Sequence, residues 1–88
     1  MLRIEFITAA EKGLGNIDKH IAQRILKKIR WLAENVEHIN HAPLSAQFKD
    51  TYKLRVGDYR VLYTIERDDT DFVLIHLVGH RREIYKLK

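Results

Sequence analysis

The chain has 88 residues, a formal net charge of +4 at pH 7 and no cysteine. This length predicts a single domain over residues 1–88, because a second hydrophobic core would have too little chain to bury. The lack of cysteine excludes disulfide frameworks, thiolate zinc sites and cysteine nucleophiles. No segment reaches the ~18 consecutive apolar residues of a membrane span and no secretory cleavage pattern is present, so we expect a cytoplasmic protein without a membrane partner.

A half-buried strand is predicted first, because apolar and charged residues alternate from Leu2 to Ile7. Thr8 and Glu11 then have the spacing of a capping box, which predicts that a helix starts there with Thr8 as the capping residue. Gly13 and Gly15 each cost a helix interior about 1 kcal/mol relative to alanine, so this helix is expected to be short.

A longer amphipathic helix follows, with Asp18 as its expected cap. Apolar residues recur at helical spacing over residues 17–36, and lysine and arginine occupy most of the opposite face, which predicts roughly five turns. The two helices would form an αα-hairpin across Gly15–Asn16. Trp31 is expected at the margin of the core or in an interface.

Three strands are predicted after a loop around Pro43. Tyr52–Val56 and Tyr59–Ile65 alternate between apolar and polar residues, and Gly57–Asp58 between them has the composition of a two-residue hairpin turn. The third strand, Phe72–Val78, is apolar on both faces and is expected to lie inside the sheet.

The predicted fold class is α+β: an N-terminal strand, a helical hairpin and a three-stranded antiparallel meander, with the helices packed on one face of the sheet. Residues His80–Lys88 are expected to form a basic tail with about one turn of helix.

The predicted hairpin brings cations together on the face opposite the helices. A two-residue turn places Arg55 directly opposite Arg60, with Lys53 on the same side. Like charges in such a pair destabilise a sheet, so a compensating anion is expected: the carboxylate of Asp58 or Glu66, or a bound phosphate. The structural alternative is a set of solvated surface cations whose stems lie over the sheet.

A second basic cluster, His80, Arg81 and Arg82 with Tyr85, follows the strand that should neighbour the hairpin. Cations around an aromatic ring suit RNA. Cleaving RNA without a metal needs a base, a stabiliser of the phosphorane and an acid, and Tyr85, Arg81 and Arg60 could divide these tasks. A tyrosine has an ordinary pKa of about 10, so the surrounding cations must favour its phenolate. His80 is either a second acid or base or a phosphate contact.

Two segments resemble the signature of the RelE/ParE toxins: K-L-R-V-G-D-Y-R-V-L-Y over residues 53–63 and L-V-G-H-R-R-E-I-Y over residues 77–85. The order of predicted elements is similar along nearly the whole chain. The resemblance implies the toxin of a type II toxin–antitoxin pair. RelE-type toxins cleave mRNA in the ribosomal A site without metal, and an antitoxin neutralises them by wrapping the fold. ParE-type toxins share the fold but inhibit DNA gyrase and lack the RNA-cleaving set.

The resemblance also implies roles for individual residues. Arg81 matches the arginine that stabilises the transition state, Arg60 the arginine assigned to the phosphate and leaving group, and Tyr85 the base. Lys53 matches one of two family lysines, whereas Thr51 occupies the position of the other. RNA or phosphate contacts are expected from four further residues, namely Arg55, His80, Arg82 and Lys49, of which Lys49 would replace the missing lysine if its loop bends back.

Three functions therefore remain open from the sequence. The first is a ribosome-dependent, metal-independent mRNA endoribonuclease with no cofactor, whose partners are the ribosome, mRNA and a cognate antitoxin. The second is a gyrase inhibitor of the ParE type. The third is a catalytically weak protein that only binds an antitoxin, in a complex that contacts DNA through the antitoxin. The antitoxin is expected in the grooves beside the long helix and the sheet.

Overall fold

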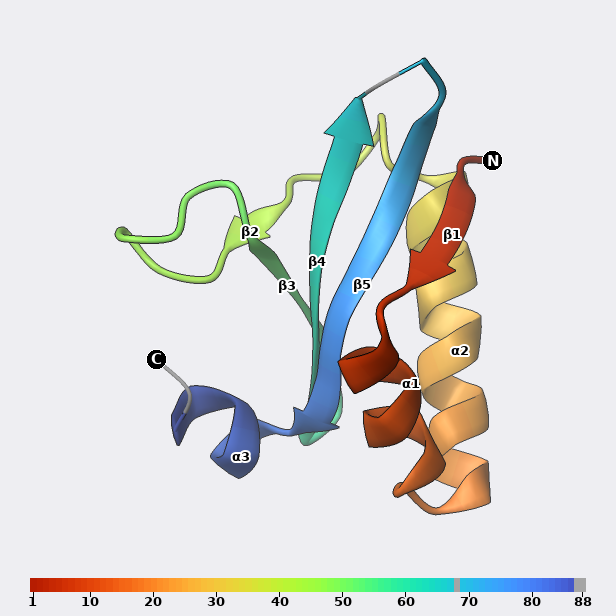
Figure 1. The fold of residues 1–88 in the computed structure, drawn as a ribbon, viewed down its shortest axis with the longest axis vertical. Coiled ribbons are helices and arrows are strands. Elements are labelled where there is room, and N and C mark those ends of the chain that lie inside the picture. The colour runs from red at the N-terminus through yellow and green to blue at the C-terminus, as the bar shows by residue number, and fades with distance from the viewer. Residues whose placement is uncertain (68, 87–88) are drawn as a thin grey trace.

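A five-stranded sheet with strand order β1-β5-β4-β3-β2 organises the computed structural model, which describes residues 1–67 and 69–86 (Figure 1). β1 runs parallel to β5, and the other neighbours are antiparallel. The strands are β1 (Arg3–Phe6), β2 (Ala42–Pro43), β3 (Tyr52–Val56), β4 (Tyr59–Arg67) and β5 (Asp71–His80). The helices are α1 (Thr8–Gly15), α2 (Lys19–Glu34) and α3 (Arg81–Lys86). The predicted α+β class and the position of β5 inside the sheet are confirmed.

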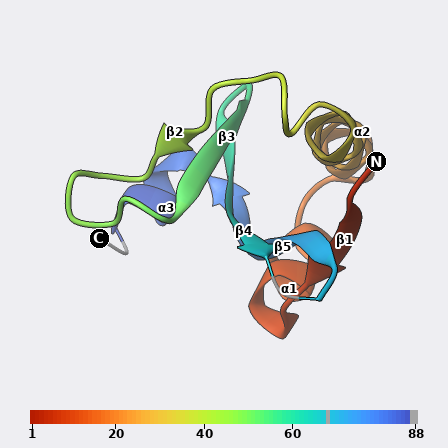
Figure 2. The same cartoon turned by 90° about the horizontal axis from the view of Figure 1, so that it is seen from above.

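The helices lie on two sides of the sheet. α2 covers one face, α1 joins the same core, and α3 lies on the opposite side of β3 and β4 (Figures 1 and 2). The helical hairpin is therefore on one face as predicted, and α3 is the expected turn of helix in the basic tail, of which residues 87 and 88 lie outside the described residues. Within the described part of the chain, no helix is both long enough and apolar enough to cross a membrane.

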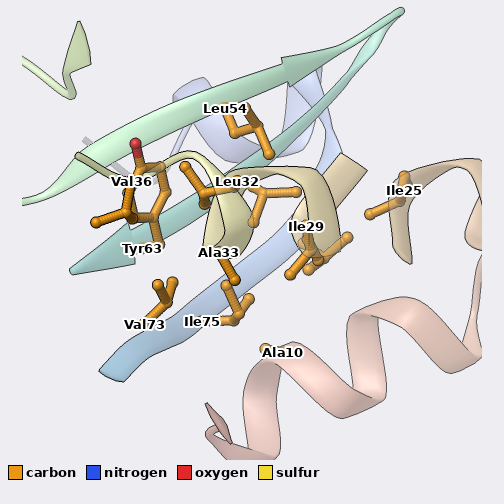
Figure 3. Packing of buried hydrophobic residues seen from close by; sticks show 12 residues of the cluster. Ala10, Ile25, Ile29, Leu32, Ala33, Val36, Leu54, Tyr63, Val73 and Ile75 are labelled. Carbon is orange, nitrogen blue, oxygen red and sulfur yellow. The ribbon is translucent and has the colours of Figure 1, made fainter. Parts of the chain in front are cut away.

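The main core fills the space between α2 and the sheet (Figure 3). Its largest fully buried side chains come from α2, β4 and β5: Ile25, Ile29, Leu32, Val61, Tyr63, Val73 and Ile75. Burying an aliphatic side chain of this size stabilises the fold by about 1.5–3 kcal/mol. The apolar faces predicted for α2 and for the hairpin strands are the faces that meet here.

The start of α1 differs from the prediction. Its N-cap is Ile7, no side chain caps it, and the Ile7 carbonyl accepts the backbone N–H groups of Ala10 and Glu11. The predicted capping box with Thr8 is wrong, because Ile7 still donates its N–H to the Ile75 carbonyl and the chain turns directly out of the β1–β5 ladder. The Asp18 cap of α2 is confirmed, since its Oδ1 accepts the backbone N–H of His20 at 3.0 Å.

The loop predicted around Pro43 contains a short strand. β2 pairs with β3 through Ala42 opposite Lys53 and Pro43 opposite Tyr52. Proline lacks an N–H group, and it is tolerated here because β2 is the edge strand of the sheet. The five-stranded sheet thus extends the predicted meander by one edge strand and by the parallel β1.

An aromatic cluster ties the end of α2 to the sheet. His41 Nε2 lies 2.9 Å from the Val36 carbonyl and Nδ1 lies 2.5 Å from the Tyr63 hydroxyl. A carbonyl only accepts, so Nε2 carries the proton and Nδ1 accepts from Tyr63. The rings of His41, Tyr52 and Tyr63 pack against one another with centroids 5.3–5.7 Å apart. Burial, and secondarily the neighbouring Tyr52, raises the pKa of the Tyr63 phenol above its ordinary value.

This pKa shift predicts a loss of stability in alkali. Because the pKa of Tyr63 is higher in the folded chain, its stabilising effect is complete below pH 10 and is lost as the pH rises further. The wild type should lose up to about 1.4 kcal/mol of unfolding free energy per pH unit above pH 10 relative to Tyr63→Phe. Urea denaturation between pH 8 and pH 11.5 measures this, and parallel curves for the two proteins would contradict it.

Gly13 allows α1 to lie against the backbone of β5. A Cβ atom at this position would be 2.3 Å from the Val78 carbonyl oxygen, which is backbone and has little room to move. A Cβ atom at Gly15 would meet nothing within 4 Å. α1 therefore covers the edge of β5 beyond the end of β1, where unpaired strand groups would otherwise be exposed.

The substitution Gly13→Ala should lower the free energy of unfolding by about 1–3 kcal/mol, because the methyl group forces α1 away from β5. Gly15→Ala is the matched control in the same helix and should raise it by up to about 1 kcal/mol, since alanine favours helix more than glycine does. Urea denaturation of both variants tests this, and similar effects from the two substitutions would refute the close-approach explanation.

Candidate functional site

The hairpin between β3 and β4 is the foundation of the site. Gly57 has a φ of 59°, and no other described residue has a positive φ, which fits a type II′ turn with glycine in first position. The predicted register is confirmed, with Val56 opposite Tyr59 and Arg55 opposite Arg60. Lys53, Arg55 and Arg60 therefore share the face that points away from α2.

Arg60 is buried, with 5% of its surface exposed. Its Nη1 donates to the carbonyls of Gly57 and Tyr59, both at 2.8 Å, and its Nε donates to the Tyr85 hydroxyl at 3.1 Å. Among the described residues these bonds engage Nε and Nη1, and none engages Nη2. The backbone carbonyls hold the guanidinium under the turn, with Tyr85 beside it.

The carboxylate predicted to compensate Arg60 is not found in the described part of the chain. Asp58 contributes its backbone carbonyl to α3, and the Glu66 carboxylate accepts from the Thr64 hydroxyl at 2.6 Å. Carbonyl dipoles and a phenol replace the expected ion pair, because a two-residue turn folds its own carbonyls back over the side chain at this position.

α3 brings Tyr85 to Arg60. The backbone N–H of Arg81 donates to the Asp58 carbonyl at 2.8 Å, which fixes the start of α3 to the hairpin turn. Ile84 is buried and lies next to Gly79 on the same side of the sheet as Arg60. Lys53 completes this group, since its Nζ is 5.8 Å from the centre of the Tyr85 ring. We call Lys53, Arg60 and Tyr85 the phenol–cation cluster.

The other predicted site residues lie outside this cluster. Four of them are exposed cations, namely Lys49, Arg55, Arg81 and Arg82. Thr51 is half-buried. His80 is half-buried, and its ring packs edge-on against Tyr59 at 5.4 Å, on the α2 side of the sheet. Its Nδ1 accepts the backbone N–H of Arg82 at 3.1 Å.

The phenol–cation cluster has the chemistry of an anion site with a proton-transfer group. A guanidinium N–H that donates to a phenol oxygen binds it more tightly as negative charge builds on that oxygen. The neighbouring ammonium of Lys53 acts in the same direction. Within residues 1–67 and 69–86, no group of three or more His, Asp or Glu side chains is arranged to hold a metal ion.

Sequence reasoning missed two contributors to the site. The Gly57 and Tyr59 carbonyls fix the Arg60 guanidinium, and the Tyr59 ring supports His80. Both could have been inferred from the hairpin register. It places Tyr59 directly after the turn and Arg60 one residue further on, within reach of the carbonyl groups of the turn.

A second cationic surface lies on α2, on the other side of the sheet. α2 contains five Lys or Arg residues and one Glu, so its net charge equals the +4 of the whole chain. A groove between α2 and β3 is lined by Arg24, Lys27, Lys28, Trp31 and Val56. Trp31 is 37% exposed, and Lys28 Nζ lies 3.8 Å from the centre of its ring. Trp31, expected at the margin of the core or in an interface, therefore lies exposed in this groove and outside the main core.

The chain was compared with known proteins. The family model described as "ParE toxin of type II toxin-antitoxin system, parDE" matches residues 4–85. A search of curated protein sequences found no match.

Among solved structures, the RelBE2 toxin–antitoxin complex of Mycobacterium tuberculosis is 27% identical, with a TM-score of 0.77 over 91% of this chain and 98% of that one. The RelB–RelE complex of Methanococcus jannaschii is 25% identical, with a TM-score of 0.69 over 94% and 96%. A mutant of the E. coli RelE toxin in the free state is 22% identical and supports the fold, with a TM-score of 0.74 over 97% and 90%.

The buried hydrogen bonds of Arg60 predict a contrast between the two arginines that face each other across the hairpin. Arg60→Met keeps an apolar side chain but removes the N–H groups that donate to Gly57, Tyr59 and Tyr85, and should lower the free energy of unfolding by about 1–3 kcal/mol. Arg55→Met, at the exposed partner position, should change it by no more than about 0.5 kcal/mol. Urea denaturation compares the two variants, and equal effects would show that the Arg60 bonds do not stabilise the hairpin.

Proposed function

We propose that this chain, which belongs to the ParE toxin family within the RelE/ParE superfamily of type II toxin–antitoxin toxins, acts by ribosome-dependent cleavage of mRNA. The observation that carries this proposal is the phenol–cation cluster, in which a buried arginine donates to the Tyr85 hydroxyl beside a lysine. This arrangement offers a proton-transfer group beside two cations, which RNA cleavage without a metal requires.

Each group in the proposed reaction has a defined task. Tyr85, as phenolate, removes the proton from a ribose 2′-hydroxyl, and the 2′-oxygen attacks the adjacent phosphorus. Arg60 and Arg81 stabilise the phosphorane that forms, the bond between phosphorus and the 5′-oxygen then breaks, and the leaving oxygen takes a proton from water. Lys53 favours the phenolate through its positive charge. Arg55, Arg82 and Lys49 contribute phosphate contacts along the message.

The proposed site has one lysine where the toxins that it resembles have two. Lys53 lies near the Tyr85 ring, whereas Thr51 stands at the second lysine position and is uncharged. One cation fewer beside the base gives less stabilisation of its phenolate. We therefore expect slower cleavage than in a toxin that has both lysines.

The comparisons support an antitoxin as a protein partner, because similar chains were solved in toxin–antitoxin complexes. We propose that the antitoxin covers the groove between α2 and β3. The groove combines the half-exposed Trp31 ring with three cations, Arg24, Lys27 and Lys28, which suits an acidic amphipathic segment. DNA binding would then reside in the complex through the antitoxin.

A second candidate function is inhibition of DNA gyrase. The observation that favours it is the family model itself, which describes ParE toxins rather than RelE toxins. In this case the chain would bind its target without cutting RNA, and the phenol–cation cluster would serve only to dock α3.

Cleavage of message on ribosomes programmed with an empty A site tests the leading proposal. Tyr85→Phe and Arg81→Ala should each lower the cleavage rate by about 10²-fold or more, because each removes a group that acts in the transition state. Tyr52→Phe and Arg67→Ala are the matched controls, since both side chains lie away from the cluster and should leave the rate nearly unchanged.

The same proteins should be added to purified gyrase. Intact message on programmed ribosomes together with loss of supercoiling would replace the nuclease with the gyrase inhibitor. Cleavage that is equal in Tyr85→Phe and in the wild type would rule out the proposed base.

A further inference from the structure

His80 occupies the position that caps α3. It is the last residue of β5 and directly precedes Arg81, the first residue of the helix. Its Nδ1 accepts the backbone N–H of Arg82 at 3.1 Å, the geometry in which an N-cap side chain satisfies a free donor of the first turn. Histidine can accept through Nδ1 only when it is neutral and carries its proton on Nε2.

The residues around His80 hold its ring in the orientation that lets Nδ1 accept the Arg82 N–H. Its partner across the β4–β5 ladder is Tyr59, and the two rings meet edge to face with centroids 5.4 Å apart and an interplanar angle of 74°. This contact lies on the α2 side of the sheet, whereas Arg60 and Tyr85 lie on the other side. The imidazole is therefore directed away from an RNA held by the phenol–cation cluster.

α3 depends on contacts with the rest of the chain. It has six residues, which is too few for a helix to be stable on its own. Besides the cap, the contacts that dock it among the described residues include the Arg81 N–H to the Asp58 carbonyl, the burial of Ile84, the Arg60–Tyr85 hydrogen bond and the approach of Lys53 to the Tyr85 ring. Loss of the cap therefore lowers the docked population of the helix that carries Tyr85.

We propose that His80 is a positioning residue whose neutral imidazole caps α3 and thereby holds the Tyr85 hydroxyl beside Arg60. For its catalytic consequence this inference rests on the proposed nuclease function, but the docking of α3 can be measured without it. Protonation of His80 removes the acceptor and leaves the helix start uncapped. The docking of α3 should therefore weaken once the imidazole has taken up a proton.

The groups around His80 make a protonated imidazole unfavourable at the start of α3. Tyr59 packs on it from β4, Asp58 in the turn presents its carbonyl to the start of α3, and Arg81 and Arg82 follow on the helix. A positive imidazolium at the N-terminal end of a helix, next to two arginines, is electrostatically unfavourable. Acid therefore weakens the docking of α3 rather than strengthening it.

Two substitutions separate capping from other roles of His80. His80→Asn keeps a side chain that accepts at the N-cap but does not titrate, and His80→Ala removes the cap. Amide hydrogen exchange of Ile84 and Tyr85, measured by NMR, reports the docking of α3 in the isolated toxin. At pH 7.5 we expect His80→Ala to lower the protection of these amides three- to thirtyfold, and His80→Asn to stay within about threefold of the wild type.

The pH dependence gives an independent comparison. Acid that protonates the imidazole should lower the wild-type protection factors of these amides, while those of His80→Asn stay constant, because the asparagine amide takes up no proton. The remaining four histidines are present in both proteins and cancel in the comparison. Equal pH profiles in the two proteins, or full protection of α3 in His80→Ala, would overturn the proposal.

Cleavage on programmed ribosomes completes the test. His80→Ala should lower kcat about as much as it lowers α3 protection, and His80→Asn should restore it. A loss of cleavage in both variants while α3 remains protected would assign His80 to the chemistry and refute a positioning role. If the wild type does not cleave, the nuclease proposal fails, and the exchange data still decide whether His80 caps α3.

Discussion

The buried guanidinium of Arg60 is the interaction on which the rest of the site depends. A charge removed from water is tolerated only when hydrogen bonds replace its hydration, and here backbone carbonyls of the hairpin turn and the Tyr85 hydroxyl take that role. The same three bonds close the turn, orient the guanidinium and dock the last helix. The stability of the hairpin and the geometry of the site therefore depend on the same hydrogen bonds, so a substitution of Arg60 affects both.

The sheet also separates two positively charged surfaces that the net charge alone does not distinguish. The phenol–cation cluster lies on the α3 side, where its charge is organised by hydrogen bonds and partly withdrawn from water. The α2 side holds lysines and arginines around a partly exposed tryptophan. A structured site for one anionic group and a broad surface for a charged partner thus coexist in a domain of 88 residues.

Much of this arrangement could be predicted from the sequence where local rules decide the outcome. The Gly57–Asp58 turn fixed the register of the hairpin, and period-two alternation then placed Arg55 opposite Arg60. The burial of Arg60 could not be predicted, because it depends on α3 returning over the sheet. The predicted capping box at Thr8 is wrong because pairing of Ile7 with β5 outweighs a local cap, and the contact of His80 Nδ1 with the Arg82 N–H depends on a helix start that the sequence alone does not locate.

The parallel pairing of β1 with β5 has a consequence for the order of assembly. The first strand of the sheet finds its partner only after residues 71–80 have been synthesised, and α1 can rest its Gly13 against Val78 no earlier. Until then the apolar face of α2 can pack, within the sheet, only on the hairpin of β3 and β4. The candidate site can therefore be completed only after the last two elements of the chain, β5 and α3, have been synthesised.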